Sequence, residues 1–138
     1  MPLHDDQTIA PDAILYRVLP HPNWVKVEAG VTRPSSIAFF ESRQEVSFFV
    51  DGPGILNELR RIFPGAPIAK VPAAVLREKG LAIERRPDEC GDDFHGDTAS
   101  HVVVGPAEQI EPNLYEKRAR SIAKHPDVGI VSEEPQGQ

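Results

Sequence analysis

Arg33, Ser35 and Ser36 stand together in the stretch TRPSSIAFF, directly before an apolar run. An arginine guanidinium with neighbouring hydroxyls and backbone N–H groups can bind a phosphate or a carboxylate. The same stretch also fits turn chemistry, in which Pro34 fixes the backbone, Ser35 bonds a nearby main-chain group and Arg33 pairs with an acid. The residue types alone leave both interpretations open.

Two histidines, His95 and His101, lie in or directly after the polar stretch RPDECGDDFHGDTAS at 86–100. An imidazole titrates near neutral pH and a flanking carboxylate can orient it, so either ring can serve as a general acid or base. His101 also begins the apolar run HVVVG, where a buried ring needs a hydrogen-bond partner. A structural role that bridges a loop to a strand therefore competes with a catalytic one.

Asp51 ends the apolar run EVSFFV and precedes Gly-Pro-Gly, which is typical of a turn or capping residue and also places a carboxylate at the end of a strand. Cys90 lies among acidic residues, an unfavourable setting for a reactive thiolate. The spacing of Cys90, His95 and His101 matches no familiar zinc pattern. The sequence predicts no metal site and no cofactor.

The sequence contains none of the motifs GxxxxGK[ST], GxGxxG, HExxH, GxSxG or paired CxxC. One enzyme hypothesis remains, for a nucleotide or other phosphate-bearing substrate. In it, Arg33 holds the anion, Ser35 positions the substrate and His101 is the general acid or base, with Ser36, Asp51 and His95 as ligand-binding residues. This hypothesis requires Arg33 and His101 to share one concave pocket.

The charge of the chain favours some partners over others. The formal net charge is -6, from 21 acidic and 15 basic side chains, so the protein repels nucleic acid and anionic lipid at long range. A basic strip on the last predicted helix is the exception and can bind phosphate or an acidic partner. Its members are Lys117, Arg118, Arg120 and Lys124. A charged helix face is, however, usually only solvated surface, and Glu116 partly offsets this one.

A chain of 138 residues with 40% hydrophobic and 26% charged residues is typical of one folded domain. We expect flexible segments at 1–12 and 132–138 and a single domain over 13–131. One cysteine, no secretory signal pattern and no apolar run of membrane-spanning length indicate a cytoplasmic protein.

The apolar patterns predict strands over 14–20, 24–27, 36–40, 45–50, 67–71, 81–85 and 101–105, with a closing edge strand over 127–131. Helices are predicted over 54–65, 72–80 and 113–124, where apolar residues recur at helical spacing. The fold class is therefore α+β. We expect a mixed or antiparallel sheet of about five or six short strands, with two or three helices packed on one side.

The stretches RPSSIAFF, SFFVD, LREKGLAIERRPDE and HVVVG, followed by a basic helix, resemble a group of small uncharacterised bacterial proteins. That resemblance implies no activity. The chain is also loosely similar to ADP-ribosyltransferase-like toxins, for which Arg17, Ser36 and Glu108 are the nearest equivalents, although the diagnostic spacing is missing.

The predicted function is that of a small cytoplasmic bacterial accessory protein that binds a partner macromolecule or a ligand. Short strands that leave an apolar face, together with the acidic loop, suit a protein partner or self-association. A small phosphate-bearing ligand is the second kind of partner, and general nucleic-acid or membrane binding is not expected. The alternative is the enzyme described above.

Overall fold

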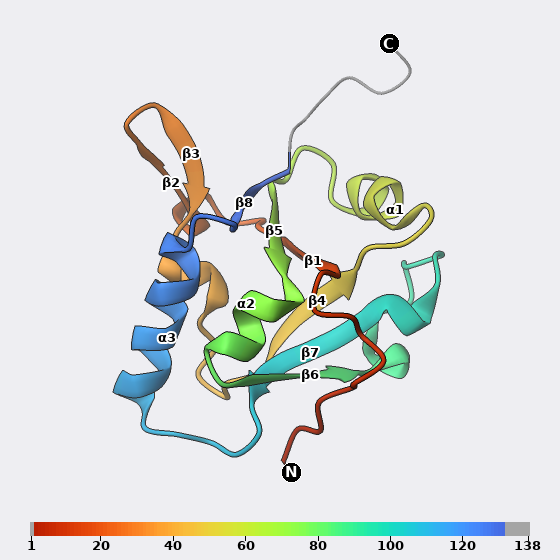
Figure 1. The fold of residues 1–138 in the computed structure, drawn as a ribbon. Coiled ribbons are helices and arrows are strands. Elements are labelled where there is room, and N and C mark those ends of the chain that lie inside the picture. The colour runs from red at the N-terminus through yellow and green to blue at the C-terminus, as the bar shows by residue number, and fades with distance from the viewer. Residues whose placement is uncertain (1, 132–138) are drawn as a thin grey trace.

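The computed structural model describes residues 2–131, and the tail predicted to be flexible at 132–138 lies outside them. A six-stranded antiparallel sheet forms the centre of the molecule (Figure 1). In their order across the sheet the strands are β6 (Leu81–Arg85), β7 (His101–Pro106), β4 (Val46–Val50), β1 (Ile14–Val18), β5 (Ile68–Pro72) and β8 (Gly129–Ile130). The predicted α+β class is confirmed.

Within residues 2–131, three α-helices and a separate hairpin complete the fold. The helices are α1 (Ile55–Ile62), α2 (Ala73–Glu78) and α3 (Pro112–Lys124), and the hairpin consists of β2 (Val25–Glu28) and β3 (Val31–Pro34). No helix within residues 2–131 combines the length and apolar character that crossing a membrane requires.

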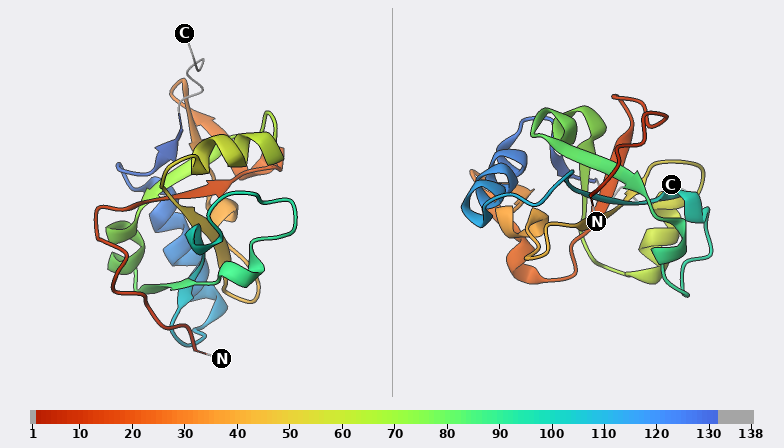
Figure 2. Two further views of the ribbon diagram at one scale, coloured as in Figure 1. Left: turned by 90° about the vertical axis from the view of Figure 1, so that its right-hand side faces the viewer. Right: turned by 90° about the horizontal axis from the view of Figure 1, so that it is seen from below.

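The helices cover both faces of the sheet, so the prediction that they pack on one side is wrong. Successive side chains of a strand point to opposite faces. Leu15 of β1 therefore packs in the larger core with α2 and α3, whereas Tyr16 packs with Ile55 and Leu59 of α1. The larger core lies between the sheet and the pair α2 and α3, and α1 lies on the other side (Figure 2).

Residues 36–40 do not form the predicted strand. They begin with a 3-10 helix, η2 (Ser36–Phe39), in which the adjacent residues Ala38 and Phe39 are both buried. A short apolar run fits a strand and a buried helical turn equally well, because it is too short to show a period. Tyr115 of α3 donates its hydroxyl to the Phe39 carbonyl at 3.2 Å, and burial raises the pKa of Tyr115 to about 12.

A buried arginine holds η2 against the sheet. The Arg17 side chain of β1 donates to the carbonyls of Ala38 at 2.8 Å and Ser47 at 3.2 Å. Its guanidinium also lies 3.4 Å from the Glu41 carboxylate and 4.8 Å from the centre of the Trp24 ring. Burial lowers the pKa of Arg17, and Glu41 counteracts that shift. One cation thus joins β1, β4 and the segment that follows β3.

Residues 2–12, here called the N-terminal strap, pack against the domain and are part of it. Leu3 is 4% exposed and contacts Ala82 and Val103, while Ile9 is 2% exposed and belongs to the larger core. These contacts do not agree with the interpretation of 1–12 as a flexible segment outside the domain. Apolar residues separated by polar ones gave no periodic signal from which their burial could be recognised.

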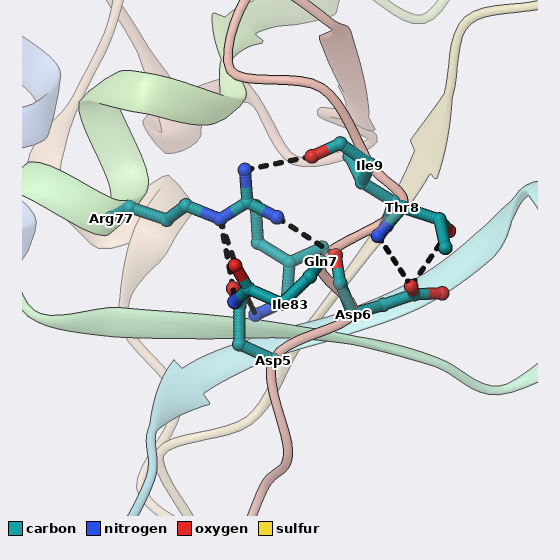
Figure 3. A network of polar contacts seen from close by, with 7 residues as sticks. All are labelled: Asp5, Asp6, Gln7, Thr8, Ile9, Arg77 and Ile83. Carbon is teal, nitrogen blue, oxygen red and sulfur yellow. Dashed lines mark hydrogen bonds and ion pairs between the residues drawn. The ribbon is translucent and has the colours of Figure 1, made fainter.

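Arg77 of α2 fastens the strap (Figure 3). Its guanidinium donates to the carbonyls of Ile9 at 2.8 Å and Asp6 at 2.9 Å, and it pairs with the Asp5 carboxylate at 3.1 Å. Asp5 in turn accepts the Ile83 N–H at 2.8 Å, and the Asp6 N–H donates to the Ile83 carbonyl at 2.7 Å. The strap therefore covers the outer edge of β6, which would otherwise present unpaired backbone groups.

The Arg17→Met variant tests the role of the buried cation. Methionine fills a similar space but leaves the carbonyls of Ala38 and Ser47 without their donor, so we expect a loss of about 3 kcal/mol in the free energy of unfolding. Urea denaturation at 25 °C measures it. Arg120→Met, at an exposed position of α3, is the control, with an expected change within about 0.5 kcal/mol. Equal stability of the two variants would contradict the assignment.

The strap should loosen in acid because of Asp6. Hydrogen bonds from the Thr8 side chain and backbone, together with Arg85, lower the pKa of Asp6 below its ordinary value of 3.8. A lowered carboxyl pKa contributes stability that is present above 3.8 and is lost as the pH falls through the folded-state value. We expect amide-exchange protection of the strap, corrected for intrinsic rates, to fall in that range. Asp6→Asn should reduce this pH step, and the remainder is due to Glu84, which accepts the His4 backbone N–H at 2.7 Å and also has a lowered pKa. A step unchanged in Asp6→Asn would contradict a role for Asp6.

Candidate functional site

Arg33 is occupied by the main chain rather than open to a ligand. It lies on β3, and its guanidinium donates to the carbonyls of Ala123 at 2.9 Å and His125 at 3.0 Å. These carbonyls belong to the end of α3, where a helix has unpaired acceptors and a favourable potential for cations. Arg33 therefore attaches the hairpin to α3.

The two serines form a turn. The Ser35 hydroxyl donates to the Asn23 carbonyl at 2.9 Å, and the Ser35 N–H donates to the Trp24 carbonyl at 2.8 Å. Ser36 is half-buried and begins η2. The turn interpretation of TRPSSIAFF thus accounts for the hydrogen bonds of Ser35. It also predicted that Arg33 pairs with an acid, but Arg33 instead donates to two carbonyls.

His101 is a buried structural residue at the start of β7. It is 2% exposed, and its Nδ1 lies 2.8 Å from the Arg86 carbonyl. A carbonyl only accepts, so Nδ1 carries the proton. The ring also packs edge-on against Phe49 at 5.1 Å. The imidazole thus joins the 86–100 loop to the central sheet.

Arg33 and His101 lie far apart. β3 lies beside β8, and three strands, β4, β1 and β5, separate β8 from β7. Four inter-strand steps correspond to about 19 Å. His101 also packs with Phe49 on the α1 face, whereas Arg33 binds the end of α3 on the opposite face. The shared pocket that the enzyme hypothesis requires is not formed.

The other predicted ligand-binding residues are scattered. Asp51 is exposed after β4 and lies next to the Tyr16 hydroxyl; burial, with the Asp51 charge and hydrogen bond, raises the pKa of Tyr16 to about 12. His95 is exposed in the 86–100 loop, and its backbone N–H, not its ring, donates to the Glu58 carboxylate at 2.6 Å. Within residues 2–131 no three His, Cys, Asp or Glu side chains are arranged to hold a metal ion.

The residues suggested by the toxin resemblance do not form a site either. The Arg17 guanidinium is buried and bound to carbonyls, as described above. Glu108 is exposed in the loop between β7 and α3. A catalytic arginine in such a site must reach its substrate, which the position of Arg17 prevents.

A different group of polar side chains does converge, at a surface depression between the end of α2 and one face of α3. It has a volume of about 380 Å³. We call it the basic depression, and its lining residues are Glu78, Lys79, Gly80, Lys117, Arg118 and Ser121. Three of the six carry a positive charge and one a negative charge.

Local structure explains why these residues meet. Gly80 follows α2 with φ +79°, the left-handed conformation that ends helices and favours glycine. On α3, the positions of Lys117, Arg118 and Ser121 share one side of the helix. The Arg118 guanidinium lies directly over Gly80, because a Cβ added there would be only 2.8 Å from Nη1.

Two of the three cations of the depression lack partners within residues 2–131. Lys117 and Arg118 make no ion pair or hydrogen bond with the described part of the chain, and Lys79 has only a 4.0 Å contact with Glu78. By contrast, Arg120 on the same helix pairs with Glu116 at 3.3 Å. The three cations outnumber the single carboxylate, Glu78, so the depression is a place where an anion can bind.

The sequence identified this site in part. Lys117 and Arg118 belong to the predicted basic strip, but Arg120 and Lys124 do not line the depression. Lys79, Gly80 and Ser121 were missed. The sequence signal near them is the Lys79-Gly80 pair at the end of a predicted helix. No local pattern shows how close that pair lies to α3.

The Gly80→Ala variant tests the packing of Arg118 on Gly80. The matched control is Gly65→Ala, since Gly65 has φ +79° and open space around its Cβ position. Both variants should lose about 1 kcal/mol of unfolding free energy from the left-handed backbone. Only Gly80→Ala should displace Arg118, seen as a shift of its Nε–H resonance by NMR. A comparable Arg118 shift in Gly65→Ala would contradict this packing.

Comparison with known proteins gives no relative from which a role can be transferred to these residues. No family model, no curated protein and no solved structure matches the chain. A function for the basic depression therefore rests on its own charges and geometry.

Proposed function

We propose that this protein is a cytoplasmic binding protein that holds the phosphate group of a small ligand in the basic depression. The observation that carries the proposal is the convergence of Lys79, Lys117 and Arg118 from two elements, with Lys117 and Arg118 unpaired within residues 2–131. The single cysteine, Cys90, is a free thiol, as expected in a reducing compartment.

The side chains present suit a tetrahedral anion. The Arg118 guanidinium offers two parallel N–H donors, Lys117 and Lys79 offer mobile ammonium groups, and the Ser121 hydroxyl adds a neutral donor. Gly80 has no side chain, which leaves room for the Arg118 guanidinium to lie over the backbone at the end of α2. A volume of about 380 Å³ is at the small end of ligand sites and suits a phosphate with a compact attached group.

The electrostatics favour a small anion over a polyanion. The whole chain carries a net charge of -6, which repels nucleic acid at long range. The depression, with three cations and Glu78, is a local exception. Its attraction acts within about 10 Å at ordinary ionic strength, and a monophosphate presents its charge within that distance.

The composition of the depression favours binding over catalysis. None of its six lining residues is a histidine, the side chain that most often transfers protons, or a cysteine, the most nucleophilic side chain. Within residues 2–131 the Ser121 hydroxyl makes no hydrogen bond to a side chain that could activate it as a nucleophile.

A titration with inorganic phosphate, followed by two-dimensional NMR at constant ionic strength, tests the proposal. We expect saturable shifts at Lys79, Gly80 and residues 117–121, with weaker binding at higher salt. Arg118→Gln should weaken binding about tenfold, because a charge-assisted hydrogen bond contributes about 1.5 kcal/mol or more. Gly80→Ala should also weaken it.

The matched control is Arg120→Gln, which removes a charge from the same helix outside the depression. It should leave phosphate affinity within about twofold, as expected for an exposed charge screened by salt. Sodium acetate in place of phosphate distinguishes a phosphate site from a general carboxylate site. Equal losses in Arg118→Gln and Arg120→Gln, or shifts that do not saturate, would contradict binding in the basic depression.

A further inference from the structure

The β2–β3 hairpin forms a two-stranded sheet of its own and extends away from the six-stranded sheet (Figures 1 and 2). Val27 is 69% exposed and Val31 is 55% exposed, on opposite faces of the hairpin. A two-stranded sheet is only marginally stable in water, and additional strands or packing stabilise it. β3 lies beside β8, so β2 is the outer strand.

The free edge of β2 centres on Val27. Ser35 N–H donates to the Trp24 carbonyl, and the ladder continues with Val25 opposite Pro34 and Val27 opposite Thr32. Hydrogen-bonded and non-hydrogen-bonded pairs alternate along an antiparallel ladder. The N–H and C=O of Val27 therefore point away from β3, toward the open edge.

The outer edges of the six-stranded sheet differ from this one. The N-terminal strap bonds to Ile83 of β6 through the backbone and side chain of residues 5 and 6. β8 at the other end lies beside β3. Within residues 2–131, β2 is thus the edge that neither the strap nor a neighbouring strand covers.

The sequence of β2, Val-Lys-Val-Glu, is complementary to itself. When two copies pair antiparallel about Val27, Lys26 faces the partner's Glu28 and Glu28 faces the partner's Lys26. These residues fall at non-hydrogen-bonded pairs, where side chains lie closest. Lys26 and Glu28 already share one face of β2, since Lys26 Nζ lies 3.2 Å from Glu28 Oε2.

We propose that two copies of this chain associate through their β2 edges. The two hairpins then form one four-stranded antiparallel sheet in the order β3-β2-β2-β3. The Val27 residues of the two copies meet on one face, and two Lys–Glu pairs form on the other. Strands of four residues bury less area than a permanent dimer requires, so the dimer forms reversibly with increasing concentration.

Exchanging the charges of Lys26 and Glu28 provides a test that is specific for the pairing of the two β2 strands. Lys26→Glu places Glu opposite Glu, and Glu28→Lys places Lys opposite Lys, so each variant alone should dissociate about tenfold more readily. An equimolar mixture of the two variants restores both attractive pairs and should form a heterodimer. The double variant, with both charges exchanged, should dimerise like the unmodified chain.

Sedimentation velocity over a wide concentration range measures these outcomes. Val27→Lys adds a second probe, because it places two ammonium groups together and should leave the chain monomeric, while thermal melting checks that the hairpin remains folded. A chain that is monomeric at all concentrations, or a mixture no more associated than its components, would overturn the proposal. The phosphate titration does not involve β2, so either proposal can fail alone.

Discussion

The structure depends on a cation placed inside its core. Arg17 points from the central strand β1 into the larger core, where its hydrogen bonds to Ala38 and Ser47 replace the water that burial removes. Without those carbonyls the buried charge would be very unfavourable, and without Arg17 the carbonyls would lack donors. These hydrogen bonds favour the η2 turn in the segment at 35–41, because the turn places the Ala38 carbonyl at the guanidinium and Phe39 in the core.

Other arginines serve the same purpose in different places. Arg33 binds the last carbonyls of α3, and Arg77 binds those of the strap. Planar guanidinium groups with several donors suit this role, because one side chain can satisfy several main-chain acceptors. An arginine beside serines in a sequence can therefore suggest a ligand site although, in the folded protein, the arginine binds main-chain carbonyls. Arg118 differs, since its donors have no acceptor within residues 2–131.

Sequence patterns were sufficient for several elements. β1 follows from alternation, the helix α3 from helical spacing, and β4 and β7 from apolar runs rich in β-branched and aromatic residues. The α+β class follows from these elements. Three features do not follow from such patterns: the 3-10 turn that begins at Ser36, the packing of the strap, and the side of the sheet that α1 covers. Each depends on a contact between residues distant in the chain, such as Arg77 with Ile9 or Tyr16 with Leu59, and local patterns carry no information on those pairs. For the same reason, only two of the six residues that line the basic depression, Lys117 and Arg118, belong to the basic strip predicted from the sequence.

The helix α3 connects the two surfaces for which we propose binding. Its residues 117, 118 and 121 line the basic depression, and its end is held by Arg33 of the hairpin. A helix rises 1.5 Å per residue, so Lys117 and Arg118 lie about 8 to 9 Å from Ala123 along one rigid element. Arg33 thus affects the position of the basic depression without lining it. By fixing α3 to the hairpin, it sets where the hairpin edge lies relative to Lys117 and Arg118.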